Sequence, residues 1–293
     1  MRLAVLFWCY KAPDLCEDRL AHLRRQDPDV KVFVLFGGDP AEAKAFEERL
    51  SPYANDFYCF EGEPPVGSEE LDVLFRGGTH WKYYFGDLLI AAWYRERGRE
   101  LEFDSITLIQ WDMVMWGRVS EVFASLGEGE ALFSGLRPIA PVEDKWAWTT
   151  PDRPEERARY LEFLDHVRSL GFDGEPEGYV AVVTCLPRAF LERFIEIERP
   201  DLGFLEYRLP IYARLFGTPI CERHPFRPWW GAVEPYSKDH TLRARPVEIR
   251  PWTIRKNLRD PNGARLFHPY WHRTPAGLIG WTRALVRGLR SRD

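Results

Sequence analysis

The chain has 293 residues, enough for one large domain or two modest ones with a sizeable hydrophobic core. Hydrophobic residues make up 45% of it and charged residues 29%, as is typical of a globular protein in water. The formal net charge of −5 argues against a nucleic-acid-binding protein, because such domains normally carry a basic surplus.

The cysteines and the first residues point to the cytoplasm. The five cysteines form no CxxC pair, and an odd number fits no disulfide framework, so we expect reduced and mostly buried thiols. The apolar start of the chain lacks a small-residue cleavage site, which favours a first strand over a signal peptide. No segment approaches the roughly 20 apolar residues needed to cross a bilayer. We therefore expect a cytoplasmic protein.

Strand and helix patterns alternate in the first half of the chain. Strand, helix and strand within residues 3–36 predict a βαβ unit with a right-handed parallel crossover. We expect strands at residues 3–9, 30–36, 56–61, 105–110 and 131–136, and helices at 15–26, 39–50, 79–100 and 117–126.

The second half is less regular, and residues 138–178 are rich in charge, Pro and Trp. We expect helices at residues 154–170, 187–197 and 205–215, and strands at 180–185 and 219–221. The whole pattern predicts a single α/β domain with a mainly parallel central sheet flanked by helices.

Asp112 is the residue that most needs an explanation. It lies in ITLIQWDMVMWG, residues 106–117, which otherwise has the pattern of a buried strand. An unpaired carboxylate in the core is costly, so Asp112 must leave the core, find a partner or hold a cation. Either the strand ends near Gln110 and Asp112 opens the next turn, or Asp112 binds a metal or ligand at the carboxyl end of the strand.

Three separated segments resemble one family, the nucleotide-sugar-dependent glycosyltransferases of the GT-A type. They are HWKYYFGDLLIAAWYRERG with FDSITLIQWDMVMWG, then FLEYRLPIYARLFG, and then ARLFHPYWHR. Their order and spacing carry the resemblance, which spans about residues 1–275. It implies a GT-A-like single domain at residues 1–275, with a nucleotide-binding half at 1–137 and an acceptor-shaping half at 138–275.

The resemblance also implies an activity. The protein would move a sugar, as a hexosyltransferase does, from a nucleoside-diphosphate sugar to an acceptor hydroxyl. A glycan, a lipid-linked molecule or a small molecule could supply that hydroxyl. Two alternatives stay open: a related sugar-nucleotide or nucleotidyl transferase, and a non-catalytic nucleotide- or carbohydrate-binding protein.

The family's metal signature is Asp-x-Asp, and the matching triplet is Gln110-Trp111-Asp112. The resemblance implies that Asp112 ligates a divalent cation, Mn²⁺ or Mg²⁺, while Gln110 contacts a ribose without adding charge. His268 in the LFHP segment is the second expected ligand, and an imidazole ligand favours Mn²⁺. The alternative for His268 is a structural histidine in a Pro-rich turn.

Other residues are expected to complete the site. Glu206 is the candidate base for the acceptor hydroxyl, with Asp144 and Glu177 as rivals. The alternative for Glu206 is an acid that stabilises a helix N-terminus. Trp229 and Trp230 are expected to form an acceptor platform or lid, because two adjacent Trp residues in a loop are hard to bury together.

On the donor side, the resemblance implies phosphate contact by Lys82 and nucleoside contact by Asp87. Trp8 or Tyr10 would stack on the base, and Trp111 would complete this set. The alternatives are ordinary surface charges for Lys82 and Asp87, and core packing for the aromatic residues.

The last segment, residues 276–293, has the pattern of a basic amphipathic helix. One face carries Leu278, Trp281, Leu285 and Leu289, and another carries Arg283, Arg287 and Arg290. Such a helix suits an anionic bilayer surface, where each basic residue adds on the order of 1 kcal/mol. Peripheral contact of residues 277–293 with the inner membrane face and packing of this helix on the domain both stay open.

Overall fold

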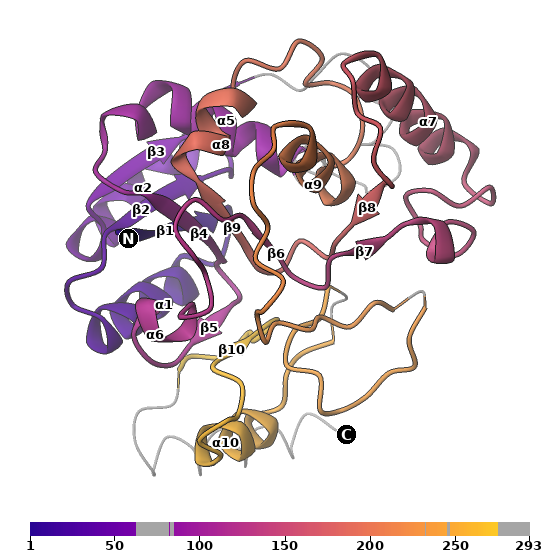
Figure 1. Ribbon diagram of the computed structural model, residues 1–293. Helices are drawn as coiled ribbons and strands as arrows, with labels where there is room; N and C mark the ends of the chain where they lie inside the picture. Colours follow the sequence, from indigo (N-terminus) through magenta and orange to yellow (C-terminus); the bar gives the residue numbers. More distant parts are fainter. Residues whose placement is uncertain (63–81, 83–84, 232, 245–246, 275–293) are drawn as a thin grey trace.

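The computed structural model describes residues 1–62, 82, 85–231, 233–244 and 247–274 (Figure 1). Most of the start of the helix expected at residues 79–100 lies outside them. The basic segment at 276–293 lies wholly outside them, so the membrane contact and the cytoplasmic location stay predictions. No helix among the described residues is both long and apolar enough to span a bilayer.

A six-stranded sheet forms the centre of the molecule. Its strands are β1 (Leu3–Cys9), β2 (Val32–Phe36), β3 (Asp56–Cys59), β4 (Ser105–Gln110), β6 (Leu132–Phe133) and β9 (Thr184–Pro187). They lie in the order β3-β2-β1-β4-β9-β6, and the first four run parallel. Strand β9 is antiparallel to both β4 and β6. The predicted mainly parallel α/β fold is confirmed.

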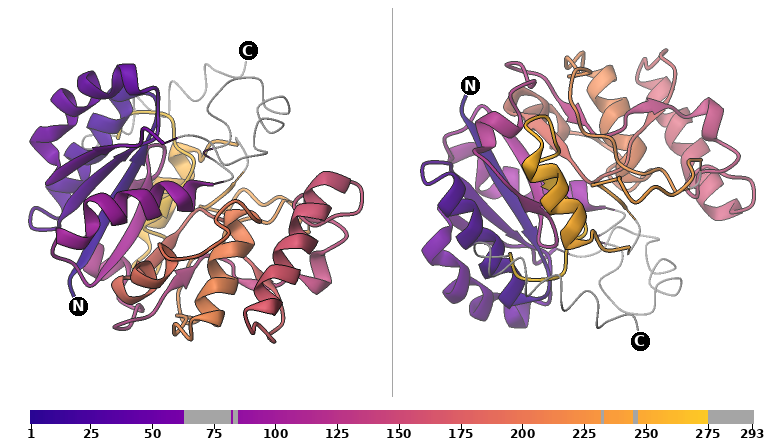
Figure 2. Two further views of the ribbon diagram at one scale, coloured as in Figure 1. Left: turned by 90° about the horizontal axis from the view of Figure 1, so that it is seen from above. Right: turned by 90° about the horizontal axis from the view of Figure 1, so that it is seen from below.

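Helices cover both faces of this sheet, which is why β1 and β2 are apolar along almost their whole length. Helices α1 (Pro13–Gln26) and α2 (Pro40–Leu50) pack together on one face, and α5 (Gly86–Glu96) lies on the other (Figures 1 and 2). The chain leaves β1 towards β2 on one side, whereas β4 lies on the other side. This change of direction makes the carboxyl ends of β1 and β4 the expected place for a ligand.

The second half adds shorter elements around this centre. They are α6 (Val119–Val122), α7 (Pro154–Ser169), α8 (Arg188–Phe194), α9 (Leu205–Leu215), α10 (Pro251–Arg259), β5 (Val114–Met115), β7 (Arg137–Pro138), β8 (Glu177–Gly178) and β10 (Leu266–Phe267). Within the described residues, short 3-10 helices also occur at Ser51–Tyr53, Gly98–Glu100 and Ala140–Val142. Strand β5 pairs with β10, and this pairing brings the late segment to the end of β4.

Several predicted bounds were too long. The strand expected at residues 180–185 begins only at Thr184, because the preceding residues form turns. The strand expected at 219–221 is a single bridge between Ile220 and Ala131. Backbone pairing depends on neighbours that are distant in sequence, so apolar character alone overestimated both strands. The division of the domain into two halves stays a prediction.

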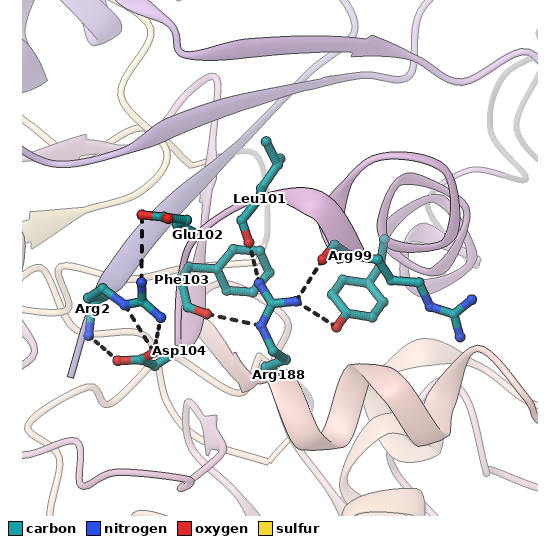
Figure 3. Close-up of polar contacts among 8 residues, drawn as sticks. Arg2, Arg99, Leu101, Glu102, Phe103, Asp104 and Arg188 are labelled. Atoms are coloured by element: carbon teal, nitrogen blue, oxygen red, sulfur yellow. Dashed lines mark hydrogen bonds and ion pairs between the residues drawn. The ribbon is translucent and has the colours of Figure 1, made fainter.

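At the amino end of the sheet, two arginines tie β1, β4 and α8 together (Figure 3). Arg2 binds the carboxylate of Asp104, just before β4, through its backbone N–H and its guanidinium. Arg188 donates to the carbonyls of Leu101 and Phe103 and lies over the Phe103 ring. These contacts hold the amino ends of β1 and β4 together, and parallel pairing continues from there to Trp8 and Gln110 at the carboxyl ends.

A fully buried ion pair joins α5 to α9. Arg208 grips both carboxylate oxygens of Asp87, and neither side chain is exposed to solvent. The same guanidinium donates to the carbonyls of Pro200 and Leu202, both at 2.8 Å. The nucleoside contact expected of Asp87 is therefore corrected: both of its oxygens are engaged by Arg208, and its role here is structural.

We expect Asp87→Asn to lower the free energy of unfolding by about 3–5 kcal/mol, because it leaves the buried Arg208 without its counter-charge. Asp201→Asn is a matched control, since Asp201 binds Arg199 through the same two-pronged geometry with side chains 32% and 47% exposed. That variant should cost less than about 1 kcal/mol. Urea denaturation measures both, and an equally small loss in the two variants would contradict the structural role of Asp87.

Candidate functional site

The candidate site lies where the carboxyl ends of β1 and β4 meet. The backbone N–H of Trp111 donates to the carbonyl of Trp8 over 2.9 Å, so the segments that contain β1 and β4 stay paired just beyond the end of β4. Asp112 follows, with only 8% of its surface exposed. Its Oδ1 lies 3.2 Å from Nε2 of His268, although the two residues are far apart in sequence.

The hydrogen bond on the other side of His268 fixes its tautomer. Nδ1 of His268 lies 2.7 Å from the carbonyl oxygen of Arg243, and a carbonyl can only accept. Nδ1 must therefore carry a proton, and in a neutral ring Nε2 turns its lone pair toward Asp112. Oδ1 of Asp112 is buried and has no hydrogen-bond donor among the described residues. With a neutral ring two electron-rich atoms would face each other, and a proton on Nε2 or a cation between them relieves that repulsion.

The carboxyl group of Asp112 is ionised at neutral pH. Burial alone would raise the pKa of Asp112, but the charge and hydrogen bonding of a protonated His268 oppose this effect. The backbone N–H of Asp112 and the side chain of Trp271 act in the same direction, so the pKa lies below its ordinary value. The site therefore contains a negative charge in a nearly dry place.

The separation of these two atoms also fits a divalent ion. Such ions hold oxygen and imidazole ligands at about 2.0–2.2 Å, so two ligands at right angles lie about 3 Å apart. The 3.2 Å between Oδ1 and Nε2 agrees with this geometry. No group of three or more His, Cys, Asp or Glu side chains that could hold a metal occurs in the part of the chain that the structure describes. The metal role of Asp112 and His268 stays a prediction.

Arg19 of α1 binds the segment at residues 270–274 and holds it against this helix. One of its terminal nitrogens donates to the carbonyls of Tyr270, at 2.6 Å, and His272, at 2.9 Å. The other donates to the hydroxyl of Thr274 at 3.2 Å. The N–H of Tyr270 in turn donates to the carbonyl of Asp112 at 2.8 Å. Arg19 thereby fixes the place of His268 relative to Asp112.

Sequence reasoning missed Arg19, although one signal was present. Arg19 lies on the same buried stripe of α1 as Cys16, Leu20 and Leu23, where an arginine is unusual. Arg243 carried no comparable signal, because it contributes its backbone carbonyl.

Glu206 lies at the start of α9 in a buried pocket with two N–H donors. Its Oε1 accepts from the N–H of Ala181 at 2.7 Å, and its Oε2 accepts from the indole of Trp148 at 2.9 Å. Burial raises the pKa of Glu206, the two N–H groups lower it in part, and the result is about 7. Gln110 donates to the carbonyl of the same Ala181 at 2.9 Å. Ala181 therefore connects Glu206 to the end of β4.

Three residues expected on the donor side lie at this edge of the sheet. The rings of Tyr10 and Trp111 meet edge to face, with centroids 5.9 Å apart. The ammonium of Lys11 lies 5.2 Å from the first ring and 5.0 Å from the second. Lys82 donates to the carbonyls of Gly37 and Gly38, just after β2, at 2.7 and 3.1 Å. Contact of Tyr10, Trp111 and Lys82 with a donor stays a prediction.

The stacking role expected of Trp8 is corrected to core packing. A Cβ atom on Gly86 would lie 2.7 Å from the Trp8 ring, and one on Gly37 would lie 3.0 Å from its nitrogen. Both glycines are therefore needed for the indole to fit between β2 and α5. The ring fills the core and is not free to stack on a ligand.

The platform expected of Trp229 and Trp230 is also corrected, because both side chains are buried, at 8% and 2% exposure. Trp229 donates its indole N–H to the carbonyl of Glu234. Trp230 packs on Trp146, with ring centroids 5.0 Å apart, and beneath the guanidinium of Arg137. Partners distant in sequence provide the burial that the loop itself could not.

No family model matches the chain. No curated protein matches it either. Solved structures do match, and those described below are glycosyltransferases by their titles.

The apo structure of WbbM, a bifunctional glycosyltransferase, aligns with 99% of this chain at 13% identity and a TM-score of 0.43. The chain covers 51% of that protein, about half its length. The galactosyltransferase LgtC, solved with donor and acceptor sugar analogs, aligns over 97% of this chain and 95% of its own at 12% identity, with a TM-score of 0.43. Mouse xyloside xylosyltransferase 1, in its apo form, aligns over 74% of this chain and 81% of its own, at 13% identity and a TM-score of 0.34. Likeness at this level assigns neither a family nor an activity to the chain.

We expect Arg19→Lys to weaken Mn²⁺ binding by about tenfold, roughly 1.4 kcal/mol, because a single ammonium cannot hold residues 270, 272 and 274 together. Arg24→Lys is the matched control. Arg24 lies on the same helix and binds the carbonyls of Tyr53 and Val30, away from the site. Titration calorimetry with Mn²⁺ and thermal unfolding separate the effects. Equal Mn²⁺ affinity in both variants would remove Arg19 from the site.

Proposed function

We propose that this protein is a glycosyltransferase that moves a sugar from a nucleoside-diphosphate sugar to an acceptor hydroxyl. The observation that carries the proposal is the pair formed by Asp112 and His268. Oδ1 of Asp112 lies 3.2 Å from Nε2 of His268, and Nδ1 of His268 donates its proton to the carbonyl of Arg243. Such a pair, with Asp112 just beyond the carboxyl end of the parallel strand β4, suits a cation and the phosphates that accompany it.

Asp112 and His268 would hold a divalent cation, Mn²⁺ or Mg²⁺, with the donor's phosphates filling further positions. When bound there, the ion would supply positive charge that stabilises the leaving diphosphate. Gln110 adds no charge, so a single carboxylate would carry the protein's share of the binding. Lys11 stands beside the same edge of the sheet and adds a cation near the expected phosphates.

Tyr10 and Trp111 support a donor site for a second reason. Their rings follow β1 and β4, at the point where open α/β sheets receive nucleotides. Tyr10 is only partly buried, and in the proposed site the exposed part of its ring contacts the base. This arrangement places the expected base beside the expected phosphates.

Glu206 supports the acceptor half of the reaction. A carboxyl group with a pKa of about 7 is close to the range in which a general base works best at neutral pH. The N–H groups of Ala181 and Trp148 fix the orientation of its two oxygens. In the proposed reaction Glu206 takes the proton of the acceptor hydroxyl as that oxygen attacks the sugar.

Calorimetry with a panel of nucleoside diphosphates, with and without Mn²⁺, tests the donor half of the proposal. Donor hydrolysis and transfer assays then test catalysis. We expect one diphosphate to bind in a Mn²⁺-dependent manner, and Asp112→Asn to lower turnover by about 100-fold or more while the fold is kept. Asp165→Asn, a change at an exposed acid of α7, should leave turnover unchanged.

Two outcomes would contradict the proposal. Near-normal turnover in Asp112→Asn would remove Asp112 from the reaction. Diphosphate binding without hydrolysis or transfer of any nucleotide sugar would leave a nucleotide-binding protein without this activity.

A further inference from the structure

Gln110 makes a contact that the acid of an Asp-x-Asp signature could not make. Its side-chain Nε2 donates to the carbonyl of Ala181 over 2.9 Å. A carboxylate in that place would set oxygen against oxygen, because both groups only accept hydrogen bonds at neutral pH. The amide is therefore the group that fits this position.

We propose that Gln110 is a positioning residue that holds Ala181 in place and, through Ala181, sets the position of Glu206 relative to Asp112. In this proposal Gln110 supports the acceptor side of the site through Ala181, and it is not a metal ligand that has lost its charge. The proposal rests on the proposed function, since it assigns Gln110 a task in the reaction of Asp112 and Glu206.

The backbone of Ala181 is held on both sides by side chains from different elements. Its carbonyl accepts from Gln110 at the end of β4, and its N–H donates to Glu206 at the start of α9. Neither contact depends on regular secondary structure, because residues 181–183 form turns. If either side chain loses its hydrogen bond, Ala181 is held from one side only.

The bond from Gln110 extends the contact between β4 and β9 beyond its last regular pair. That pair is Leu108 with Thr184, and the chain before Thr184 turns away from the ladder. Ser134 holds the flanks of this turn: its hydroxyl donates to the carbonyl of Val180 at 2.7 Å and accepts from the N–H of Val183 at 3.1 Å. Ala181 and Val182 lie between these flanks, and Gln110 and Glu206 bind Ala181.

Gln110 and Asp112 are two residues apart on one short segment. Asp112 lies against His268, whereas Gln110 bonds to Ala181, which in turn bonds to Glu206. The end of β4 thus connects both halves of the candidate site, and the amide of Gln110 is its link to the acceptor half.

Two variants test this role. Gln110→Glu keeps the length of the side chain, removes the N–H donor and restores an acid to the first position of the signature. Gln110→Met removes the donor without adding charge. Gln26→Met is the matched control, because Gln26 is also half-buried and also bonds to backbone, accepting from the N–H of Gly117 at 3.1 Å.

We expect both Gln110 variants to lower transfer by about 10- to 100-fold, through kcat and the acceptor KM together, because Glu206 shifts from its place. Mn²⁺ affinity, measured by titration without donor or acceptor, should change less than about threefold. Gln26→Met should leave transfer and Mn²⁺ affinity as in the unaltered protein.

The rate–pH profile gives a readout that simple loss of stability would not move. Glu206 must be deprotonated to act as a base, so transfer should rise with pH through its pKa of about 7. The N–H of Ala181 lowers that pKa, so losing this hydrogen bond raises it. In both Gln110 variants the acidic limb of the profile should therefore move to higher pH.

Hydrogen–deuterium exchange of the peptide that spans residues 179–183 separates this inference from the proposed function, because exchange needs no turnover. Faster exchange in Gln110→Met than in Gln26→Met would support the positioning role, even if no nucleotide sugar proved to be a donor. Unchanged exchange would overturn it. Tighter Mn²⁺ binding by Gln110→Glu with transfer kept or raised would overturn it as well, because Gln110 would then be an altered metal position.

Discussion

The carbonyl of Arg243 determines which nitrogen of His268 carries a proton, and the candidate site depends on that constraint. With Nδ1 committed to the carbonyl, Nε2 can only offer Asp112 a lone pair or, in the charged ring, a second proton. Hydrogen bonds of this kind to the far nitrogen are how proteins orient imidazole ligands. In the proposed function the same constraint orients the lone pair of Nε2 toward a cation shared with Asp112.

Rigid attachments bring the two residues of this pair together. Arg188 and Arg2 tie the amino ends of the central strands, the Asp87–Arg208 pair joins α5 to α9, and Arg19 holds the late segment against α1. Each arginine except Arg2 binds backbone carbonyls as well as, or in place of, acids. Backbone carbonyls cannot change rotamer, so these contacts hold the chain path itself. Glu206 and Asp112 depend on that path for their places.

The sequence predicted the centre of the molecule better than its borders. The alternation of apolar strands with amphipathic helices predicts the parallel sheet, since those patterns report local burial. Asp112 stands out because an acid interrupts the apolar residues that continue beyond β4. The approach of His268 to Asp112 has no local signature and followed only from the family resemblance.

The errors share a physical cause. Asp87 and the Trp229–Trp230 pair have the chemistry of ligand-binding groups, but Arg208, Trp146 and Arg137 fold onto them from distant positions. The hydrogen bonds to the carbonyls of Arg243 and Ala181 could not be predicted from the sequence, because every residue has a backbone carbonyl. The role of a side chain depends on which partner the tertiary fold places beside it, and that partner can be distant in sequence.

The most direct test of the central claim is a spectroscopic one. Pulsed electron paramagnetic resonance of bound Mn²⁺, on protein labelled with ¹⁵N-histidine, reports whether an imidazole nitrogen coordinates the ion. With a nucleoside diphosphate present, we expect a ¹⁵N coupling that disappears in His268→Ala. Tightly bound Mn²⁺ without any histidine coupling would contradict it, because the pair of Asp112 and His268 would then not be a metal site.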